Sequence, residues 1–198
     1  MNFKSICIAG VDGTGKSSTV KNLCKIIGKE KSVVQYMGAR QWESRLGIKY
    51  FVEDYYSGPF KPIMWVVSYI YEMYYRYYKH KGEGKIVIFD RYAFEHAVFR
   101  SDVENGFKGK LYSFIFKLAF LWFYPKPNKT FYLICPLEVS LSRKSDITTK
   151  QEIASLERNK RILDDFYQRR KGVVVIDTTK ENEESVISHI MSEIGLLI

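Results

Sequence analysis

The chain has 198 residues, enough for one domain with a substantial core, and its 46% hydrophobic and 27% charged residues are typical of a globular protein. Its net charge of +9 suits polyanionic ligands such as nucleotides, nucleic acid or an acidic membrane surface. The most apolar run, 111–124, contains Lys117 and is too short to span a bilayer, and no signal-peptide pattern opens the chain, so we expect no membrane partner.

A phosphate-binding loop is the first motif in the chain. Residues 3–9 are an apolar run that predicts a strand, and 16–27 have the apolar spacing of a helix. Between them, the glycine at 10 and Gly-Lys-Ser at 15–17 fit the P-loop pattern G-x-x-x-x-G-K-[ST]. Glycines let backbone N–H groups point at phosphate oxygens, and the helix adds its positive N-terminal end. The residues expected to bind the nucleotide are Gly10, Asp12, Gly13, Thr14, Gly15, Lys16, Ser17 and Ser18.

Three side chains have a predicted catalytic or metal-binding role at this loop. Lys16 is expected to reach the β- and γ-phosphates of ATP, and the Ser17 hydroxyl is expected to hold Mg²⁺. Asp90 follows a buried strand predicted at 85–89, and parallel strands place their carboxyl ends on the ligand side of a sheet. Asp90 is therefore expected beside the P-loop, near Mg²⁺ or the reacting oxygen. The alternative is that Asp90 caps a helix predicted at 93–100, but a cap alone leaves Arg91 unexplained.

Strands and helices alternate along the rest of the chain. Further strands are predicted at 32–37, 130–135 and 173–176, and further helices at 63–79, 111–123, 137–143, 151–169 and 182–194. Region 38–62 is a loop-rich insertion with a short helix at 41–46. The alternation predicts a single α/β domain over 1–198, with a five-stranded parallel sheet between two layers of helices.

The helix predicted at 63–79 is rich in tyrosine, which mostly indicates core packing. Glu72 and Arg76 interrupt its apolar pattern, and charges in such a helix usually lie on a solvated face. The alternative is that Arg76 faces a ligand, and we keep it as a candidate substrate-binding residue. The three cysteines, Cys7, Cys24 and Cys135, lack metal-site spacing and are expected to be buried thiols in the cytoplasm.

Four parts of the chain carry a family resemblance. They are the P-loop 10–18 with an acid inside it, the strand 87–92 ending in Asp-Arg-Tyr, the segments 127–133, 136–138 and 141–143, and the helix 156–167. Together they resemble the thymidylate kinase family of P-loop nucleotide kinases. The resemblance implies a three-layer α/β/α P-loop kinase fold with a short lid over about 143–151.

The resemblance implies roles on the acceptor side of the site. Asp90 would assist the acceptor and the metal, and Arg91 would bind the acceptor's phosphate, since a guanidinium can bind two oxygens at once. Asp12 would face the acceptor sugar. Tyr92 completes the Asp-Arg-Tyr motif and is counted with the substrate-binding residues.

The resemblance also implies roles on the donor side. Lys16 would stabilise the transferred phosphoryl group. Arg143, with Arg158 as a second candidate, would close over the phosphates from the lid, because the P-loop itself has Gly13 and no arginine. Lys144 and Lys150 are also available for this charge, and the alternative for them is a solvated helix end. The loop that starts with Asp177 and Thr178 matches the loop beside the adenine.

The function predicted from these features is transfer of the γ-phosphate of MgATP to a nucleoside monophosphate, with dTMP as the first choice of acceptor. Departures from the family pattern at Ala9, 36–42 and 74–77 lie on the acceptor side, as does the insertion at about 38–62. A kinase for a nucleoside, a sugar or another small metabolite therefore stays open. The positive charge keeps a 5′-polynucleotide kinase open, although we expect a small nucleotide acceptor rather than nucleic acid. A nucleotide-binding regulator without turnover is a further alternative. The resemblance also implies a homodimer as one possibility. The apolar helix predicted at 111–123 fits a dimer interface or the core equally well.

Overall fold

The computed structural model describes residues 4–38, 61–92, 124–144 and 146–195, together with Glu43, Glu95, Phe114 and Leu118. The chain divides into two compact units. The first, here called the sheet unit, comprises 1–36, 82–92 and 127–198, and the second, the α3 unit, comprises 37–81 and 93–126. The single domain over 1–198, with its insertion at about 38–62, stays a prediction.

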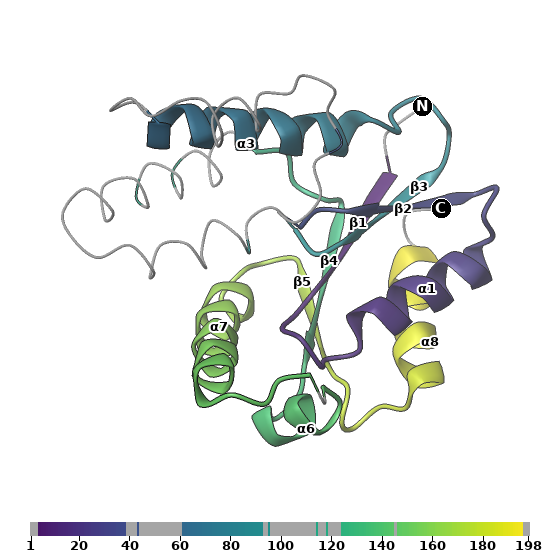
Figure 1. Ribbon diagram of the computed structural model, residues 1–198. Helices are drawn as coiled ribbons and strands as arrows, with labels where there is room; N and C mark the ends of the chain where they lie inside the picture. The colour runs from purple at the N-terminus through teal and green to yellow at the C-terminus, as the bar shows by residue number, and fades with distance from the viewer. Residues whose placement is uncertain are drawn as a thin grey trace. The chain divides into compact units, whose positions relative to one another are not determined.

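A five-stranded, all-parallel sheet forms the centre of the sheet unit (Figure 1). Its order is β2-β3-β1-β4-β5. The bounds are β1 Lys4–Ala9, β2 Ser32–Tyr36, β3 Ile86–Asp90, β4 Lys129–Ile134 and β5 Val173–Asp177. The register pairs Ile8 of β1 with Asp90 of β3, so the carboxyl end of β3 lies beside the strand that leads into the P-loop. The predicted α/β fold with five parallel strands is confirmed.

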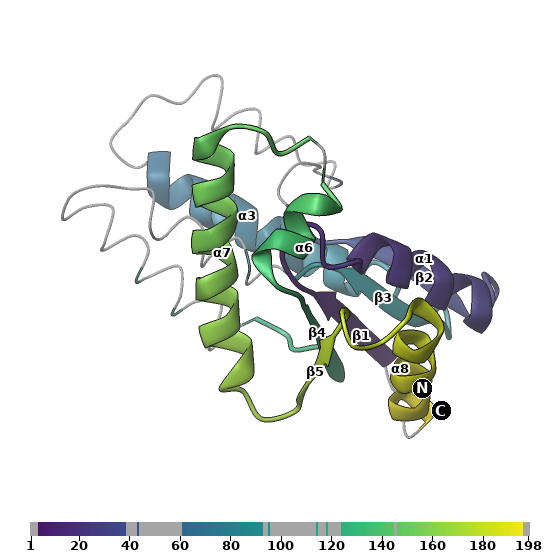
Figure 2. The same ribbon diagram turned by 90° about the horizontal axis from the view of Figure 1, so that it is seen from below.

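Helices cover both faces of this sheet, which confirms the three-layer arrangement (Figure 2). On one face lie α1, Lys16–Ile27, and α8, Glu183–Gly195. On the other lies α7, Lys150–Gln168, whose Tyr167 ring stacks on Tyr132 of β4 at 4.7 Å between centroids. A short helix, α6, spans Leu137–Ser142 after β4. The capping box of Thr149 and Glu152 begins α7 inside the predicted lid of about 143–151, so residues 150 and 151 are helical.

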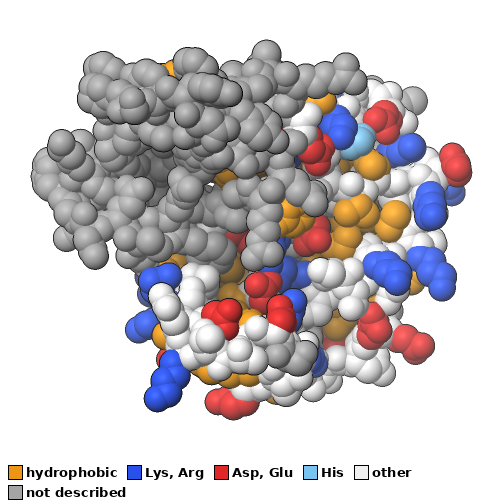
Figure 3. Space-filling model, viewed as in Figure 1, with side chains coloured by type: hydrophobic (Ala, Val, Ile, Leu, Met, Phe, Trp, Pro, Cys, Tyr) orange, Lys and Arg blue, Asp and Glu red, His pale blue; other side chains and the backbone are white. Residues whose placement is uncertain are grey.

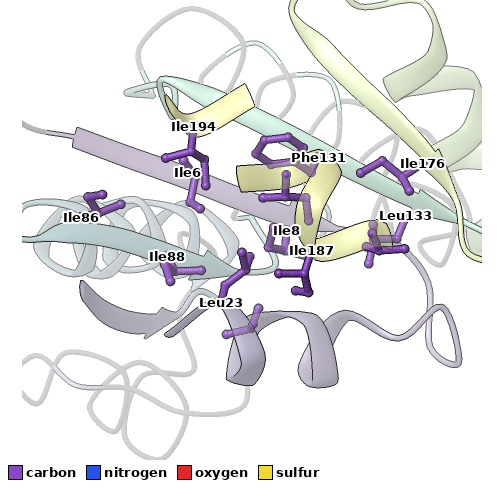
Figure 4. Packing of buried hydrophobic residues seen from close by; sticks show 13 residues of the cluster. Ile6, Ile8, Leu23, Ile86, Ile88, Phe131, Leu133, Ile176, Ile187 and Ile194 are labelled. Carbon is purple, nitrogen blue, oxygen red and sulfur yellow. The ribbon is translucent and has the colours of Figure 1, made fainter. Parts of the chain in front are cut away.

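The core between the sheet, α1 and α8 is aliphatic (Figure 4). Ile6 and Ile8 of β1 point to this face together with Phe131 and Leu133 of β4, because alternate residues of a strand share a face. Cys7, the residue between the two isoleucines, is equally buried on the opposite face. Burial on both faces explains why β1 and β3 are near-continuous apolar runs in the sequence.

The α3 unit contains the long helix α3, Lys61–Tyr78. Its buried side includes Tyr69, Met73 and Tyr77, and its exposed side includes Val67, Tyr71, Tyr75 and Tyr78. Glu72 and Arg76 are both 0% exposed. They form an ion pair of 2.7 Å within the buried side, so the solvated-face interpretation of these two charges is wrong. A ligand role for Arg76 stays a prediction.

The predicted bounds agree with the described elements to within two residues, and those of α1 agree at both ends. The helices predicted at 41–46, 93–100 and 111–123 lie outside the described residues, apart from the four single residues named above. Within the described part of the chain, no helix has the length and apolarity that crossing a membrane requires.

Candidate nucleotide-binding site

The P-loop is the tightly curled connection between β1 and α1. Gly10, Gly13 and Gly15 have positive φ angles of 146°, 84° and 89°. A Cβ atom added at Gly10 would lie 2.7 Å from the Leu133 carbonyl oxygen, and one added at Gly13 would lie 2.4 Å from the Ser140 carbonyl oxygen. The loop therefore packs against β4 and α6 at distances that only glycine permits.

The N-terminus of α1 is available to an anion. Gly15, its N-cap residue, has no side chain to accept a hydrogen bond from the first-turn N–H groups, and the first turn contains no acidic residue. Unsatisfied N–H groups and the helix dipole together make such a terminus a binding site for phosphate.

A pocket of about 530 Å³ opens over this loop. The predicted site residues that line it are Asp12, Gly13, Thr14, Gly15, Lys16, Ser17, Ser18, Arg91, Arg143 and Thr178. Lys144, one of the basic residues considered for the lid, also lines the pocket. Lining residues that were not considered are Thr19, Glu181, Asn182, Glu183 and Val186. The sequence held one signal for this second group, because asparagine is a common N-cap residue and Asn182 stands where the last helix is predicted to begin. In the structure, Asn182 accepts a hydrogen bond from the Ser185 N–H at 2.8 Å, as an N-cap does.

Charged side chains of opposite sign meet at the P-loop. Asp12 forms an ion pair with Arg91 and lies 3.8 Å from the Lys16 ammonium nitrogen. Lys16 is 5% exposed and donates a hydrogen bond to the Val11 carbonyl of its own loop. The Thr14 hydroxyl donates to the same carbonyl at 2.8 Å, so Val11 keeps a donor if Lys16 turns to a phosphate.

The two carboxylates at this point have opposite pKa shifts. Burial raises the pKa of Asp90, and the positive charges of Lys16 and Arg91 offset this only in part. Burial also acts to raise the pKa of Asp12, but the charges of Arg91 and Lys16, with the Arg91 hydrogen bond, outweigh it and lower that pKa below its ordinary value. Asp12 is thus the ionised partner of the two cations, while Asp90 holds its proton more readily.

Arg91 is held in an unusual backbone conformation. Its φ of 67° makes it the non-glycine residue with positive φ among those described. Its N–H donates to the Ile8 carbonyl at 3.1 Å, which continues the pairing of β3 with β1. Left-handed backbone costs about 1–2 kcal/mol for a residue with a Cβ, and such conformations concentrate at functional sites.

Arg143 joins the P-loop to the loop after β5. Its guanidinium donates to the Gly13 carbonyl at 3.4 Å and to the hydroxyl and carbonyl of Thr178 at 3.1 and 3.2 Å. These contacts place an arginine side chain at the pocket, and its role toward phosphate stays a prediction.

Several predicted residues do not line this pocket. Asp177 instead accepts hydrogen bonds from the Thr179 N–H and hydroxyl, at 3.0 and 2.6 Å. Tyr92 is buried against Phe89, with 5.9 Å between ring centroids. Arg158 is half-buried on α7, and Arg76 belongs to the α3 unit. Their roles in binding stay predictions, as do those of Gly10 and Asp90.

The predicted metal ligands, Ser17 and Asp90, have the kind of oxygen atoms that bind magnesium. No group of three or more His, Cys, Asp or Glu side chains that could hold a metal exists among the described residues. Ser17 and Asp90 offer a hydroxyl and a carboxylate oxygen, and Mg²⁺ is usually held by one or two such protein oxygens together with substrate phosphates.

The thymidylate kinase family model matches residues 8–190. The chain belongs to the thymidylate kinase family. This membership confirms the resemblance and places the chain among nucleotide kinases, which use ATP. Comparison with curated proteins finds no significant match.

Solved structures agree with the family fold. A deoxyadenosine kinase from M. mycoides with bound dATP matches with a TM-score of 0.65 and 16% identity, over 97% of this chain and 99% of that one. A thymidylate kinase from Candida albicans matches with a TM-score of 0.64 and 17% identity, over 98% and 92%. At 16% and 17% identity, the likeness to these structures shows the fold of the present chain and does not identify its acceptor.

Gly13→Ala is expected to lower the stability of the chain more than Gly15→Ala. Both substitutions put a Cβ on left-handed backbone, which costs about 1–2 kcal/mol. At Gly13 the Cβ also meets the Ser140 carbonyl at 2.4 Å, whereas nothing lies within 4 Å of one at Gly15. Thermal unfolding of both variants measures the difference, and a larger loss for Gly15→Ala would contradict the packing of the P-loop on α6.

Asp90 is expected to titrate at higher pH than Asp12 in the nucleotide-free protein. The lowered pKa of Asp12 gives stability that is present above the ordinary Asp pKa and is lost as the pH falls through the lowered value. The raised pKa of Asp90 works the other way, because its contribution is present at low pH and is lost as the pH rises through the raised value. Carbon NMR of the carboxyl groups measures both titrations.

The matched variant for this titration is Asp12→Asn. The negative charge of Asp12 is one cause of the raised pKa of Asp90, and removing it also removes the ion pairs that Asp12 forms with Arg91 and Lys16. The pKa of Asp90 is therefore expected to fall in Asp12→Asn. An unchanged titration of Asp90 would show that the two carboxylates do not share their cations.

Proposed function

We propose that this chain transfers the γ-phosphate of MgATP to a nucleoside monophosphate, with dTMP as the first candidate acceptor. The observation that supports this most is the pocket over the P-loop, where Lys16, Arg91 and Arg143 gather around the N-terminus of α1. Phosphoryl transfer depends on positioning and charge neutralisation, which three cations and a set of backbone N–H groups supply.

On the donor side, the phosphates of ATP lie on the P-loop and Lys16 moves from the Val11 carbonyl to the transferred group. Ser17 and Asp90 would hold Mg²⁺, which when bound would neutralise charge on the phosphates. Arg143, with Arg158 as a second candidate, offsets charge on the transferred phosphoryl group. Thr178 lies beside the base of the donor, together with its neighbour Asp177.

On the acceptor side, Arg91 binds the acceptor's phosphate and Asp12 faces its sugar, with Tyr92 and Arg76 as further candidate contacts. An oxygen of the acceptor phosphate attacks the γ-phosphorus, the bond to the bridging oxygen breaks, and ADP leaves with that oxygen. Asp12 and Arg91 are paired in the free protein, so the acceptor's phosphate has to share or replace that contact.

The Asp12–Arg91 pair also favours a second candidate function. If the acceptor carries no phosphate, as in a nucleoside or a sugar, the pair stays intact and Arg91 only positions Asp12. A 5′-polynucleotide kinase receives less support, because Lys and Arg are interspersed with Asp and Glu on the described part of the face in Figure 3.

The experiment that tests the function measures phosphate transfer from MgATP to nucleoside monophosphates, nucleosides, sugars and short 5′-hydroxyl oligonucleotides, at two salt concentrations. Efficient turnover of a monophosphate supports the proposal. Turnover confined to nucleosides or sugars favours the second candidate, and salt-sensitive turnover of oligonucleotides favours the third. ATP binding without transfer to any acceptor indicates a regulator and contradicts the proposal.

We also propose that the protein works in the cytoplasm as a homodimer. Its three cysteines are free thiols, which suits a reducing compartment. Phe114 and Leu118, one helical turn apart within the predicted helix 111–123, are 61% and 43% exposed. Sedimentation velocity tests the dimer, and a monomer at micromolar concentration would contradict it.

A further inference from the structure

A buried ion pair on α3 holds two points of the chain that follows β2. Arg76 donates from Nε to Glu72 Oε1 at 2.7 Å and from Nη1 to the Gly38 carbonyl at 2.8 Å. The same Oε1 atom of Glu72 accepts the backbone N–H of Glu43 at 2.6 Å. One carboxylate oxygen thus links the guanidinium to Glu43, while the guanidinium reaches Gly38. All four residues belong to the α3 unit.

Stability alone is a weak reason for such a pair. Both side chains are 0% exposed, and burying two charges costs much of what their attraction returns. Apolar residues of similar volume often serve as well or better for stability. The contacts to Gly38 and Glu43 instead give the pair a geometric role, because charge-assisted hydrogen bonds to backbone groups are strong and directional. Residues four apart on a helix keep a fixed spacing, so the two backbone points are fixed with them.

We propose that Glu72 and Arg76 are positioning residues that anchor Gly38 and Glu43 on α3 and thereby set the affinity for the acceptor. The link to the acceptor rests on the proposed function and on the expectation from the sequence that the insertion at about 38–62 lies on the acceptor side. In this proposal the Arg76 guanidinium binds the protein's own backbone at Gly38. The competing outcome of the test is that Arg76 contacts the acceptor directly.

The chain offers a matched control for this anchor. Lys79 Nζ contacts Glu43 Oε2 at 2.8 Å, but these side chains are 39% and 25% exposed. Exposed ion pairs contribute little, because water screens them and ordering two long side chains costs entropy. Lys79→Gln therefore removes a contact to the same residue without touching the buried pair.

The first measurement is backbone hydrogen exchange at Glu43 in the full-length, nucleotide-free protein. The double variant Glu72→Met/Arg76→Met removes both charges, so that no unpaired charge is left in the interior. Its Glu43 amide is expected to exchange about 10-fold faster or more, because the amide loses its acceptor. Lys79→Gln is expected to exchange like the wild type. Glu72→Gln, which keeps the shape and one carbonyl oxygen, is expected to lie between them and serves if the double variant does not fold.

The second measurement is steady-state kinetics with the best acceptor of the panel. The double variant is expected to raise the KM for the acceptor about 10-fold, with kcat and the KM for ATP near their wild-type values. Unchanged exchange at Glu43 overturns the anchor. Faster exchange with an unchanged acceptor KM overturns its link to the acceptor.

Arg76→Lys separates anchoring from direct binding. If this variant changes which base is accepted while Glu43 keeps its wild-type exchange rate, Arg76 is a ligand of the acceptor and the inference is wrong. If the protein transfers phosphate to no acceptor at all, the proposed function and the acceptor link both fail. Hydrogen exchange still decides on the anchor in that case, so the two failures are distinguishable.

Discussion

Lys16→Ala is expected to lower kcat for phosphate transfer about 10³-fold or more, because the charge that offsets the developing negative charge on the phosphoryl group is lost. The chain is expected to stay folded. Lys16 donates to the Val11 carbonyl in the free protein, but that carbonyl also accepts the Thr14 hydroxyl at 2.8 Å and is therefore not left without a donor.

The measurement is single-turnover transfer at saturating MgATP, with thermal unfolding as the check on the fold. Lys21→Ala is the matched control, since Lys21 is an exposed lysine on the same helix, α1. It removes an equal charge without entering the pocket and is expected to leave kcat unchanged. Turnover retained in Lys16→Ala would overturn the P-loop assignment, and equal losses in both variants would point to a general effect of charge.

Arg91→Ala is expected to lower kcat/KM for the acceptor by about 10²- to 10³-fold, with a much smaller change in the affinity for ATP. A guanidinium can bind two phosphate oxygens at once, and alanine offers neither contact. A minor effect on ATP is expected because Asp12 loses its ion pair with Arg91 but keeps Lys16 at 3.8 Å and the charge of Lys144.

Arg91→Gly is the companion variant that separates the side chain from the backbone. Glycine adopts a φ of 67° without the cost that alanine carries, so Arg91→Gly is expected to be at least as stable as Arg91→Ala and equally impaired in transfer. Equal losses of ATP and acceptor affinity in both variants would argue against a role in binding the acceptor's phosphate. An unimpaired acceptor KM would favour an acceptor that carries no phosphate.

The sequence was sufficient to predict features that depend on local pattern or on sheet topology. The P-loop and α1 follow from glycine spacing and apolar periodicity over neighbouring residues. Asp90 and Arg91 were expected near the P-loop because parallel strands end at one edge, and the pairing of Ile8 with Asp90 supports that reasoning. Both inferences depend on residue types and on the order of elements along the chain, and not on side-chain conformations.

Features that depend on side-chain partners were not predictable in the same way. Asp12 and Arg91 are 79 residues apart, and their roles by resemblance gave no indication that they would pair with each other. Likewise, the spacing of Glu72 and Arg76 is the same whether such a pair lies in solvent or in the interior. Aromatic residues occur on both the buried and the exposed side of α3, so the pattern did not indicate which side is buried. The available signal was the series Tyr69, Met73 and Tyr77, which lies beside these two charges.

The stretch between α6 and α7 is held at both ends, which limits how far it can move away from the pocket. It has seven residues, 143–149, because α6 ends at Ser142 and α7 begins at Lys150. Fully extended, seven residues span at most about 25 Å. Arg143 is held by Gly13 and Thr178 at one end, and the Thr149–Glu152 capping box holds the other.

With so short a tether, exchange of the donor nucleotide is expected to require the breaking of a few arginine hydrogen bonds rather than the swing of a separate subdomain. Rotation of an exposed side chain takes picoseconds to nanoseconds, whereas collective hinge motion takes microseconds to milliseconds. Opening of the 143–149 stretch is therefore not expected to limit the turnover rate.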